Sequence, residues 1–150
     1  MKFRFLLAWA GGATGRRDFK SEAAFVLFSE YAKRISKFVP CEVSGLSDKM
    51  PKKPGTRLWL CDTSKRAKAL SSEALARELE KLLNGGIQEL RVGIGGPDGW
   101  GPEGPDELAA DLLWSLGPMT LPHELAAIVA AEQVYRAFTI LKNLPYHSGH

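Results

Sequence analysis

The C-terminal third of the chain holds the side chains best suited to acid–base chemistry. His123 and His147 titrate near neutral pH, so either could take a proton from a substrate. Glu132 and Arg136 lie four residues apart, a spacing that suits a surface ion pair or a shared role in a site. Tyr146 could stack on a nucleic-acid base. The plainer alternatives are that His123 only fixes the start of a helix and that His147 lies on a disordered tail.

Two further segments have the composition of ligand-binding loops. Residues 93–99 follow a predicted strand and read Gly-Ile-Gly-Gly-Pro-Asp-Gly, and residues 116–121 read Leu-Gly-Pro-Met-Thr-Leu. Glycines at the end of a strand let backbone amides approach a ligand that a Cβ atom would block. The first segment is equally typical of an ordinary turn, and its spacing matches neither a dinucleotide fingerprint nor a phosphate-binding loop. The residues alone are compatible with both interpretations, a ligand-binding edge and a plain turn.

The charge distribution favours a polyanionic partner. Net charge is +3 overall, but residues 1–70 hold 15 Lys and Arg against 6 Asp and Glu, whereas residues 71–150 hold 5 against 11. A basic surface concentrates a polyanion and supplies phosphate contacts, so nucleic acid is the expected partner. The alternatives are solvated surface charges, or attraction to the acidic half of a partner subunit.

Length and composition predict one ordinary globular domain over residues 1–150, with 45% hydrophobic residues. No apolar run reaches the roughly 18 residues that span a bilayer, so we expect no membrane and a cytoplasmic location. Cys41 and Cys61 lie far apart without metal-ligand spacing, so we expect no disulfide and no metal. Paired carboxylates and a Ser/His/Asp order are also missing, and catalysis would depend largely on positioning.

Hydrophobic periodicity predicts an α/β fold with a parallel sheet and helices on both faces. Strands are expected at residues 2–9, 39–43, 57–61, 89–94 and 119–121. Helices are expected at 18–37, 71–84, 103–114 and 122–141, with Ser71 as a cap and Asn84, Gly85 and Gly86 as a left-handed ending. Residues 44–56 are predicted to form a flexible loop, because they are short and rich in Pro, Gly and Lys.

Residues 94–99, the run from Trp114 to His123 and the tail from Asn143 to His147 together closely resemble the RlmH family of SPOUT methyltransferases. Members of that family use S-adenosylmethionine to methylate N3 of a pseudouridine in large-subunit (23S) ribosomal RNA. The match fails between Cys41 and Lys68, where the family has a further helix. It also departs at residues 9–15, and Ser148 stands where the family tail has an arginine.

The resemblance implies a homodimer that acts on ribosomal RNA or the assembled ribosome, with a deep trefoil knot and the C-terminal helix in residues 94–147. It also implies a cofactor pocket formed by Leu60 or Cys61 together with Gly95, Gly96, Leu116, Gly117, Pro118, Met119, Thr120 and Leu121. The catalytic candidates are His147, Tyr146, His123, Glu132 and Arg136. The candidates for RNA binding are Arg16, Arg17, Lys20, Lys33 and Arg34. The alternative functions are a SPOUT methyltransferase for another RNA base or site, and a knotted RNA-binding module without catalysis.

Overall fold

A computed structural model describes residues 1–46, 51–100, 104 and 108–148. Six strands form one parallel sheet in the order β2-β1-β5-β3-β6-β4. The strands are β1 (Lys2–Leu7), β2 (Cys41–Gly45), β3 (Thr56–Cys61), β4 (Lys68–Ala69), β5 (Glu89–Ile94) and β6 (Leu112–Ser115). The helices are the 3-10 turn η1 (Arg16–Asp18), α1 (Glu22–Ile35), α2 (Ser72–Asn84) and α3 (His123–Leu141). The predicted parallel α/β fold is therefore confirmed.

The long helices begin and end where local chemistry requires. Ser21 and Ser71 cap α1 and α2, each side chain accepting a hydrogen bond from the amide three residues on. Helix α2 ends at Asn84, and Gly86 then takes a positive φ of 72°, as the sequence predicted. Asn143 adopts a positive φ just after α3 and turns the tail back along that helix.

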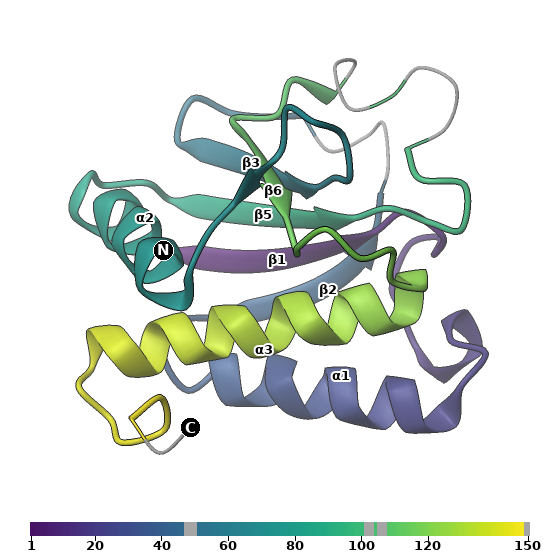
Figure 1. Cartoon of the computed structure of the whole chain (residues 1–150), viewed down its shortest axis with the longest axis horizontal. Coiled ribbons are helices and arrows are strands. Elements are labelled where there is room, and N and C mark those ends of the chain that lie inside the picture. The colour runs from purple at the N-terminus through teal and green to yellow at the C-terminus, as the bar shows by residue number, and fades with distance from the viewer. Residues whose placement is uncertain (47–50, 101–103, 105–107, 149–150) are drawn as a thin grey trace.

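The helices all pack against one face of the sheet. The main core combines Phe3, Phe5 and Leu7 of β1 with Phe28 of α1, Leu79 of α2 and a row of small residues on α3: Ala127, Ala130, Ala131 and Ala137. Figure 1 shows α1 and α3 lying side by side along this face. Within the described residues no helix covers the opposite face, so the expectation of helices on both faces is wrong for this part of the chain.

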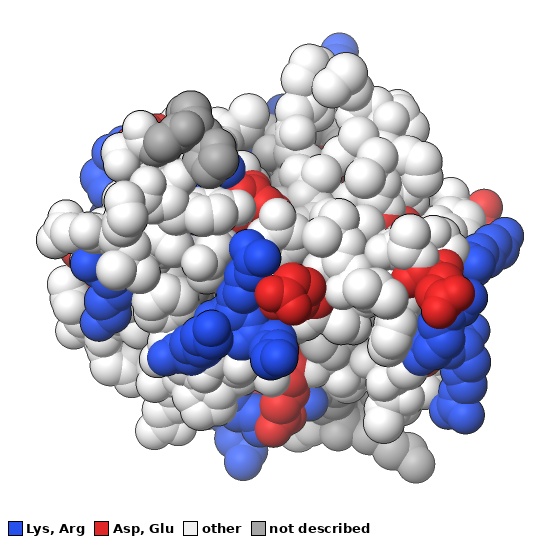
Figure 2. Space-filling model, turned by 90° about the horizontal axis from the view of Figure 1, so that it is seen from below, with Lys and Arg blue, Asp and Glu red and all other residues white. Residues whose placement is uncertain are grey.

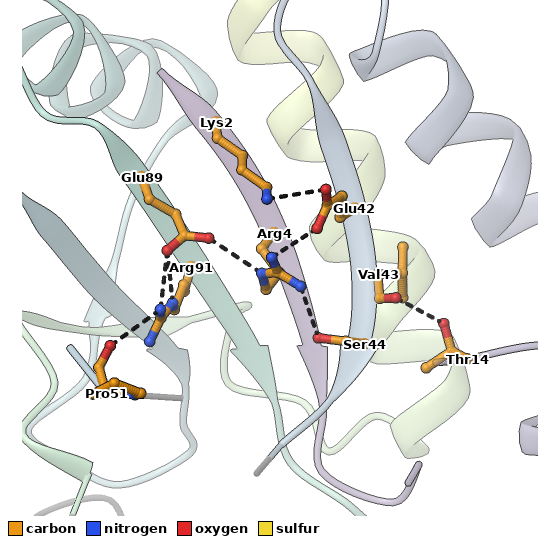
Figure 3. A network of polar contacts seen from close by, with 9 residues as sticks. All are labelled: Lys2, Arg4, Thr14, Glu42, Val43, Ser44, Pro51, Glu89 and Arg91. Carbon is orange, nitrogen blue, oxygen red and sulfur yellow. Dashed lines mark hydrogen bonds and ion pairs between the residues drawn. The ribbon is translucent and has the colours of Figure 1, made fainter. Parts of the chain in front are cut away.

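The opposite face of the sheet carries a group of charged side chains at one end and a small apolar cluster at the other. Figure 3 shows Arg4 at the centre of the charged part, 2.7 Å from Glu42 and 3.2 Å from Glu89. Lys2 lies 3.0 Å from Glu42, and Arg91 lies 3.0 Å from Glu89. The parallel register sets Arg4 beside Glu42 and Lys2 beside Glu89, which makes this alternation of sign possible. The apolar part comprises Leu6, Leu58 and Leu60, covered by Leu46, Trp100, Leu108, Ala110 and Leu113.

The region before α3 differs from the prediction. A helix was expected at 103–114, but Leu112–Ser115 forms strand β6, paired with β3 on one side and β4 on the other. Residues 119–121 are not a strand, and β4 was not predicted. A short apolar run gives no periodicity with which to separate a buried strand from a helix, and Trp114 is 2% exposed. Residues 103 and 105–107 of the expected helix, and 47–50 of the expected loop, lie outside the described residues.

Candidate functional site

A cavity of about 500 Å³ opens at the carboxyl ends of β3, β5 and β6. Parallel strands bring their carboxyl ends to one edge of the sheet, where loops can surround a ligand. Three loops and the start of α3 form the walls. The lining residues are Cys61, Asp62, Thr63, Ile94, Gly95, Gly96, Pro97, Gly99, Trp100, Leu116, Gly117, Met119, Thr120, Leu121, Pro122, His123 and Ala126.

The loop after β5 forms one wall as a tight turn. Gly96 N donates to Gly99 O at 3.0 Å, and Gly99 N donates to Gly96 O at 2.9 Å, with Gly99 at a φ of 68°. A Cβ atom on Gly95 would stand 3.2 Å from the Gly99 backbone, whereas one on Gly96 would meet only Trp9, at 3.7 Å. The residue at 95 is therefore restricted by the turn itself, but the one at 96 is not. Bare backbone faces the cavity on this side.

The loop between β6 and α3 forms the facing wall. Gly117 holds a φ of 116°, which favours glycine, and its amide donates to Ser115 Oγ at 3.1 Å. Leu116, Met119, Thr120 and Leu121 line the cavity with it, but Pro118 does not. Met119 is 74% exposed at the rim.

Strand β3 settles which of two neighbouring residues reaches the cavity. Consecutive side chains of a strand point to opposite faces, and the structure puts Cys61 at the cavity and Leu60 in the apolar cluster on the other face. The prediction had left both open. Burial raises the pKa of the Cys61 thiol to about 12, so the thiol stays protonated at neutral pH and is a poor nucleophile. Trp100 Nε1 donates to Cys61 O at 3.0 Å and closes the floor of the cavity.

Sequence reasoning missed several lining residues. Asp62 and Thr63 directly follow β3, and a polar residue after a buried parallel strand is a signal that could have indicated them. Among the described lining residues Asp62 is the single carboxylate, and Ser64 Oγ donates a hydrogen bond to it. Trp100 gave no comparable signal, because its contact with β3 depends on the path of a long loop.

His123 is the catalytic candidate that lies at this cavity. Its ring packs edge-on against Trp9, with centroids 4.6 Å apart, and its Nε2 lies 3.7 Å from Glu124 Oε2. The Glu124 carboxylate also accepts hydrogen bonds from the amides of Lys20 and Ser21, at 2.7 and 3.1 Å. The start of α3 is thus fastened to the start of α1, and this fastening holds the imidazole at the cavity.

The remaining catalytic candidates gather where the tail folds back onto the middle of α3. Glu132 Oε1 accepts from Arg136 Nη2 at 2.6 Å and from the Tyr146 hydroxyl at 3.0 Å. His147 Nδ1 lies 3.1 Å from Arg136 Nη1. Burial and hydrogen bonds to Tyr31 and Glu132 raise the pKa of Tyr146, which keeps it a donor. Glu132 and Arg136 follow His123 by nine and thirteen residues, about 14 and 20 Å along the helix axis, so within one chain this group does not reach His123.

Sequence comparison with known proteins gives the family. A family described as "Predicted SPOUT methyltransferase" matches residues 13–147. The chain belongs to the SPOUT methyltransferase family. Ribosomal RNA large subunit methyltransferase H from Koribacter versatilis is 40% identical over 137 residues, covering 87% of this chain and 92% of the relative. The protein of the same name from Deinococcus radiodurans is 40% identical over 131 residues, covering 81% and 87%. Among solved structures, methyltransferase Lpg2936 from Legionella pneumophila, in complex with SAM, is 15% identical with a TM-score of 0.48, covering 92% of this chain and 66% of that one.

In this SPOUT chain the predicted RNA-binding cations lie in separate places. Arg16, Arg17 and Lys20 precede α1, whereas Lys33 and Arg34 lie in its last turn. Figure 2 views the helical side from below and shows cations in separate groups with uncharged surface between them. Arg34 is engaged with Glu30 at 3.0 Å and stacks over the Tyr31 and Tyr135 rings, so it is less available to a phosphate than the cations before α1.

Other site types find no support in the described residues. They contain no group of three or more His, Cys, Asp or Glu side chains arranged to hold a metal ion. No helix among them is long and apolar enough to cross a membrane.

Proposed function

We propose that this chain transfers a methyl group from S-adenosylmethionine to N3 of a pseudouridine in large-subunit ribosomal RNA. The observation that carries the proposal is the cavity at the strand ends, because the residues expected from the RlmH resemblance, all but Leu60 and Pro118, line it together. The two relatives at 40% identity, both named for large-subunit ribosomal RNA methylation, support the substrate class. Action on ribosomal RNA would place the protein in the cytoplasm.

The cavity fits such a cofactor in size and chemistry. Ligand sites of small molecules measure about 300–1,000 Å³, a range that includes the observed volume of about 500 Å³. The carbonyl oxygens of Gly96 and Gly117 each keep a second lone pair that can accept from a purine amino group, Leu116 and Leu121 offer apolar contact, and Asp62 offers a carboxylate to cationic or hydroxyl groups. When bound, the cofactor supplies a methyl group on a sulfonium, which an in-line nucleophile can accept.

In this reaction the protein positions the substrate beside the cofactor and removes the N3 proton. His123 lies at the cavity, and imidazole is the side chain most often used as a general base, so we assign it this role. Holding the acceptor nitrogen in line with the methyl group can contribute roughly 7 to 11 kcal/mol. Arg136, Tyr146 and His147, on α3 and the tail, would border the substrate.

We infer a homodimer in which the tail of one subunit completes the cavity of its partner. Within one chain the tail residues contact Glu132 and Arg136, about 14 and 20 Å along α3 from His123 at the cavity. A second, apolar groove runs between the starts of α1 and α3, lined in part by Leu27, Leu125 and Ile128. Leu27 and Leu125 are 44% and 45% exposed there, and Val26 of α1 is 58% exposed. A second copy of the chain packed on this surface would bury them.

The knot expected in residues 94–147 is part of the same proposal. Strand β6 lies between β3 and β4, which are themselves joined by residues 62–67. A later segment thus occupies the gap within an earlier connection, an arrangement that supports a threaded chain.

Gly96→Val tests the cavity. Its Cβ has ordinary space, so the chain should fold with an unchanged melting temperature, while the added methyl groups narrow the cavity and weaken S-adenosylmethionine binding at least about tenfold, or 1.4 kcal/mol. Calorimetry measures the affinity. Gly11→Ala, on open surface, is the control. Unchanged affinity in the valine chain would refute the site.

Mass spectrometry of ribosomal RNA from a deletion strain tests the substrate. Loss of one N3-methylated pseudouridine supports the proposal. Loss of a different modified base would instead indicate a SPOUT enzyme with another target. No loss, despite cofactor binding, would leave a non-catalytic RNA-binding module.

The shared site has its own test. A chain ending at Lys142 should fold, dimerise and bind cofactor but fail to methylate. Mixed with Gly96→Val chains it should regain activity, because one cavity of the heterodimer then has an intact loop and an intact tail. Heterodimers that form without activity would contradict the composite site.

A further inference from the structure

A chain of polar contacts links the first turn of α2 to the middle of α3. Ser72 Oγ donates to Gln133 Oε1 at 2.7 Å, and Gln133 Nε2 donates to Glu132 Oε2 at 2.9 Å. The other oxygen of Glu132 accepts from Nε and Nη2 of Arg136, at 3.0 and 2.6 Å. Both carboxylate oxygens of Glu132 are therefore occupied, and Arg136 has a fixed orientation.

The same chain of contacts returns to α2 through the tail. Arg136 Nη1 lies 3.1 Å from His147 Nδ1, and His147 Nε2 lies 2.7 Å from Glu73 Oε1. Glu73 follows Ser72 directly, so the contacts form a closed ring. The tail is thereby fastened to both α2 and α3. Glu73 itself is held in the first turn of α2, which the Ser71 cap fixes.

The ring determines where the proton of His147 must lie. A guanidinium can only donate, so Nδ1 of His147 presents its lone pair to Arg136. A carboxylate can only accept, so Nε2 carries the hydrogen that is donated to Glu73. One neutral tautomer satisfies both partners. The charged imidazolium would set an N–H group against the guanidinium.

We propose that Glu73 is a positioning residue for the proposed methyl transfer, which fixes His147 as the neutral Nε2–H tautomer and so holds the tail in its working conformation. The inference rests on the proposed function for its catalytic meaning. Because both ring nitrogens are occupied, His147 acts as the anchor of the tail and not as the proton acceptor. Of the two histidines considered, His123 is then the one that can take the N3 proton.

The electrostatics around Glu73 agree with this arrangement. The hydrogen bond from His147 is the main cause that lowers the pKa of the Glu73 carboxyl, followed by the hydrogen bond from its own backbone amide. The groups facing the imidazole are Glu73 on α2 and Arg136 on α3. Tyr146 is held on the same side through its hydroxyl bond to Glu132 and the Arg136 guanidinium 4.9 Å from its ring.

Nitrogen-15 NMR of the imidazole at neutral pH tests the tautomer directly, with the His147 signals assigned by their loss in His147→Asn. In the natural chain we expect a proton on Nε2 and a lone pair on Nδ1. Glu73→Gln should keep this tautomer, because its amide oxygen still accepts, whereas Glu73→Ala should show both tautomers in exchange. Glu78→Ala is the matched control, since it removes a carboxylate that pairs with Lys81 on the same helix. A proton on Nδ1, or one unchanged tautomer in Glu73→Ala, would overturn the proposal.

Methylation kinetics test the consequence for the reaction. We expect Glu73→Ala to lower kcat/KM about 10- to 100-fold, as misplacement of a positioned group does, and Glu73→Gln to recover most of it. An alanine chain with mixed tautomers but full activity would show that Glu73 has no part in the transfer. If the natural chain methylates no RNA at all, the proposed function fails, while the NMR result still decides whether Glu73 sets the tautomer.

Discussion

Gly93 lies directly beneath the indole of Trp100. A Cβ atom at position 93 would stand 2.9 Å from Trp100 Cη2 and 2.6 Å from Leu60 Cδ2, closer than side-chain carbons pack. The absence of a side chain in β5 thus lets the indole settle on the sheet and donate to the carbonyl of Cys61. The floor of the cavity depends on this pair.

Gly93→Ala should therefore destabilise the fold and loosen the cavity floor. Overpacking of this kind costs about 1–3 kcal/mol. Urea unfolding gives the stability, and red-shifted tryptophan fluorescence would report that Trp100 has left the sheet. Gly11→Ala, where nothing lies within 4 Å of the added carbon, should change neither quantity. Equal stabilities of the two variants would show that this space is not tight.

Cys61 should make the protein less stable in alkali. Burial raises its pKa from 9.0 to about 12, so the folded state keeps its proton where the unfolded state loses it. Stability is then fully present below pH 9 and falls by about 1.4 kcal/mol per pH unit between pH 9 and 12. Denaturant melts of Cys61→Ala across this range should show a shallower decline than the natural chain. Parallel declines would place the thiol in water.

Glu89→Ala should cost more stability than Glu42→Ala. Glu89 is 16% exposed and pairs with both Arg4 and Arg91, whereas Glu42 is 49% exposed. Removing Glu89 takes an ion-pair partner from two largely buried guanidinium groups, which should lower the free energy of unfolding by roughly 2–3 kcal/mol. Removing the exposed Glu42 carboxylate should lower it by under about 1 kcal/mol. Thermal melts at low and high salt measure both. A larger loss from Glu42→Ala would reverse this ranking.

Charge reversal at Arg16, Arg17 and Lys20 should weaken RNA binding without affecting the cofactor. Each lost phosphate contact lowers the slope of log affinity against log salt by about one. Lys33→Glu at the far end of α1 serves as the comparison. Filter binding of ribosomal RNA across salt concentrations gives the slopes. An unchanged slope in the triple variant would mean that the segment before α1 does not touch RNA.

Much of the fold could be predicted from sequence because its signals are local. The apolar runs of β1, β3 and β5, the helical periodicity and the cap at Ser71 were sufficient for the parallel sheet and for α1 and α2, although α1 begins at Glu22 and not at residue 18. The predictions that failed depend on contacts between residues that lie far apart in the sequence. Whether Leu112–Ser115 is a strand depends on the edge of β3 that it joins, and whether a second helical layer exists depends on loops without periodicity.

For the candidate site, too, local features could be predicted and long-range contacts could not. Gly95, Gly96 and, apart from Pro118, residues 116–121 were expected at the cavity where the structure has them, because motif and family resemblance coincide there. Trp100 was not, because its place comes from the space above Gly93. The contact between His147 and Glu73 joins residues 74 positions apart and carries no pattern in the sequence.

The position of β6 between β3 and β4 also has a consequence for synthesis. A nascent chain that ends before residue 112 holds both neighbours of this strand but not the strand itself. The free edge of β3 then presents unpaired amides and carbonyls to any other extended segment, including that of another copy. Strand β6 is synthesised about 50 residues after β3, and during this interval the chain is most exposed to misassembly.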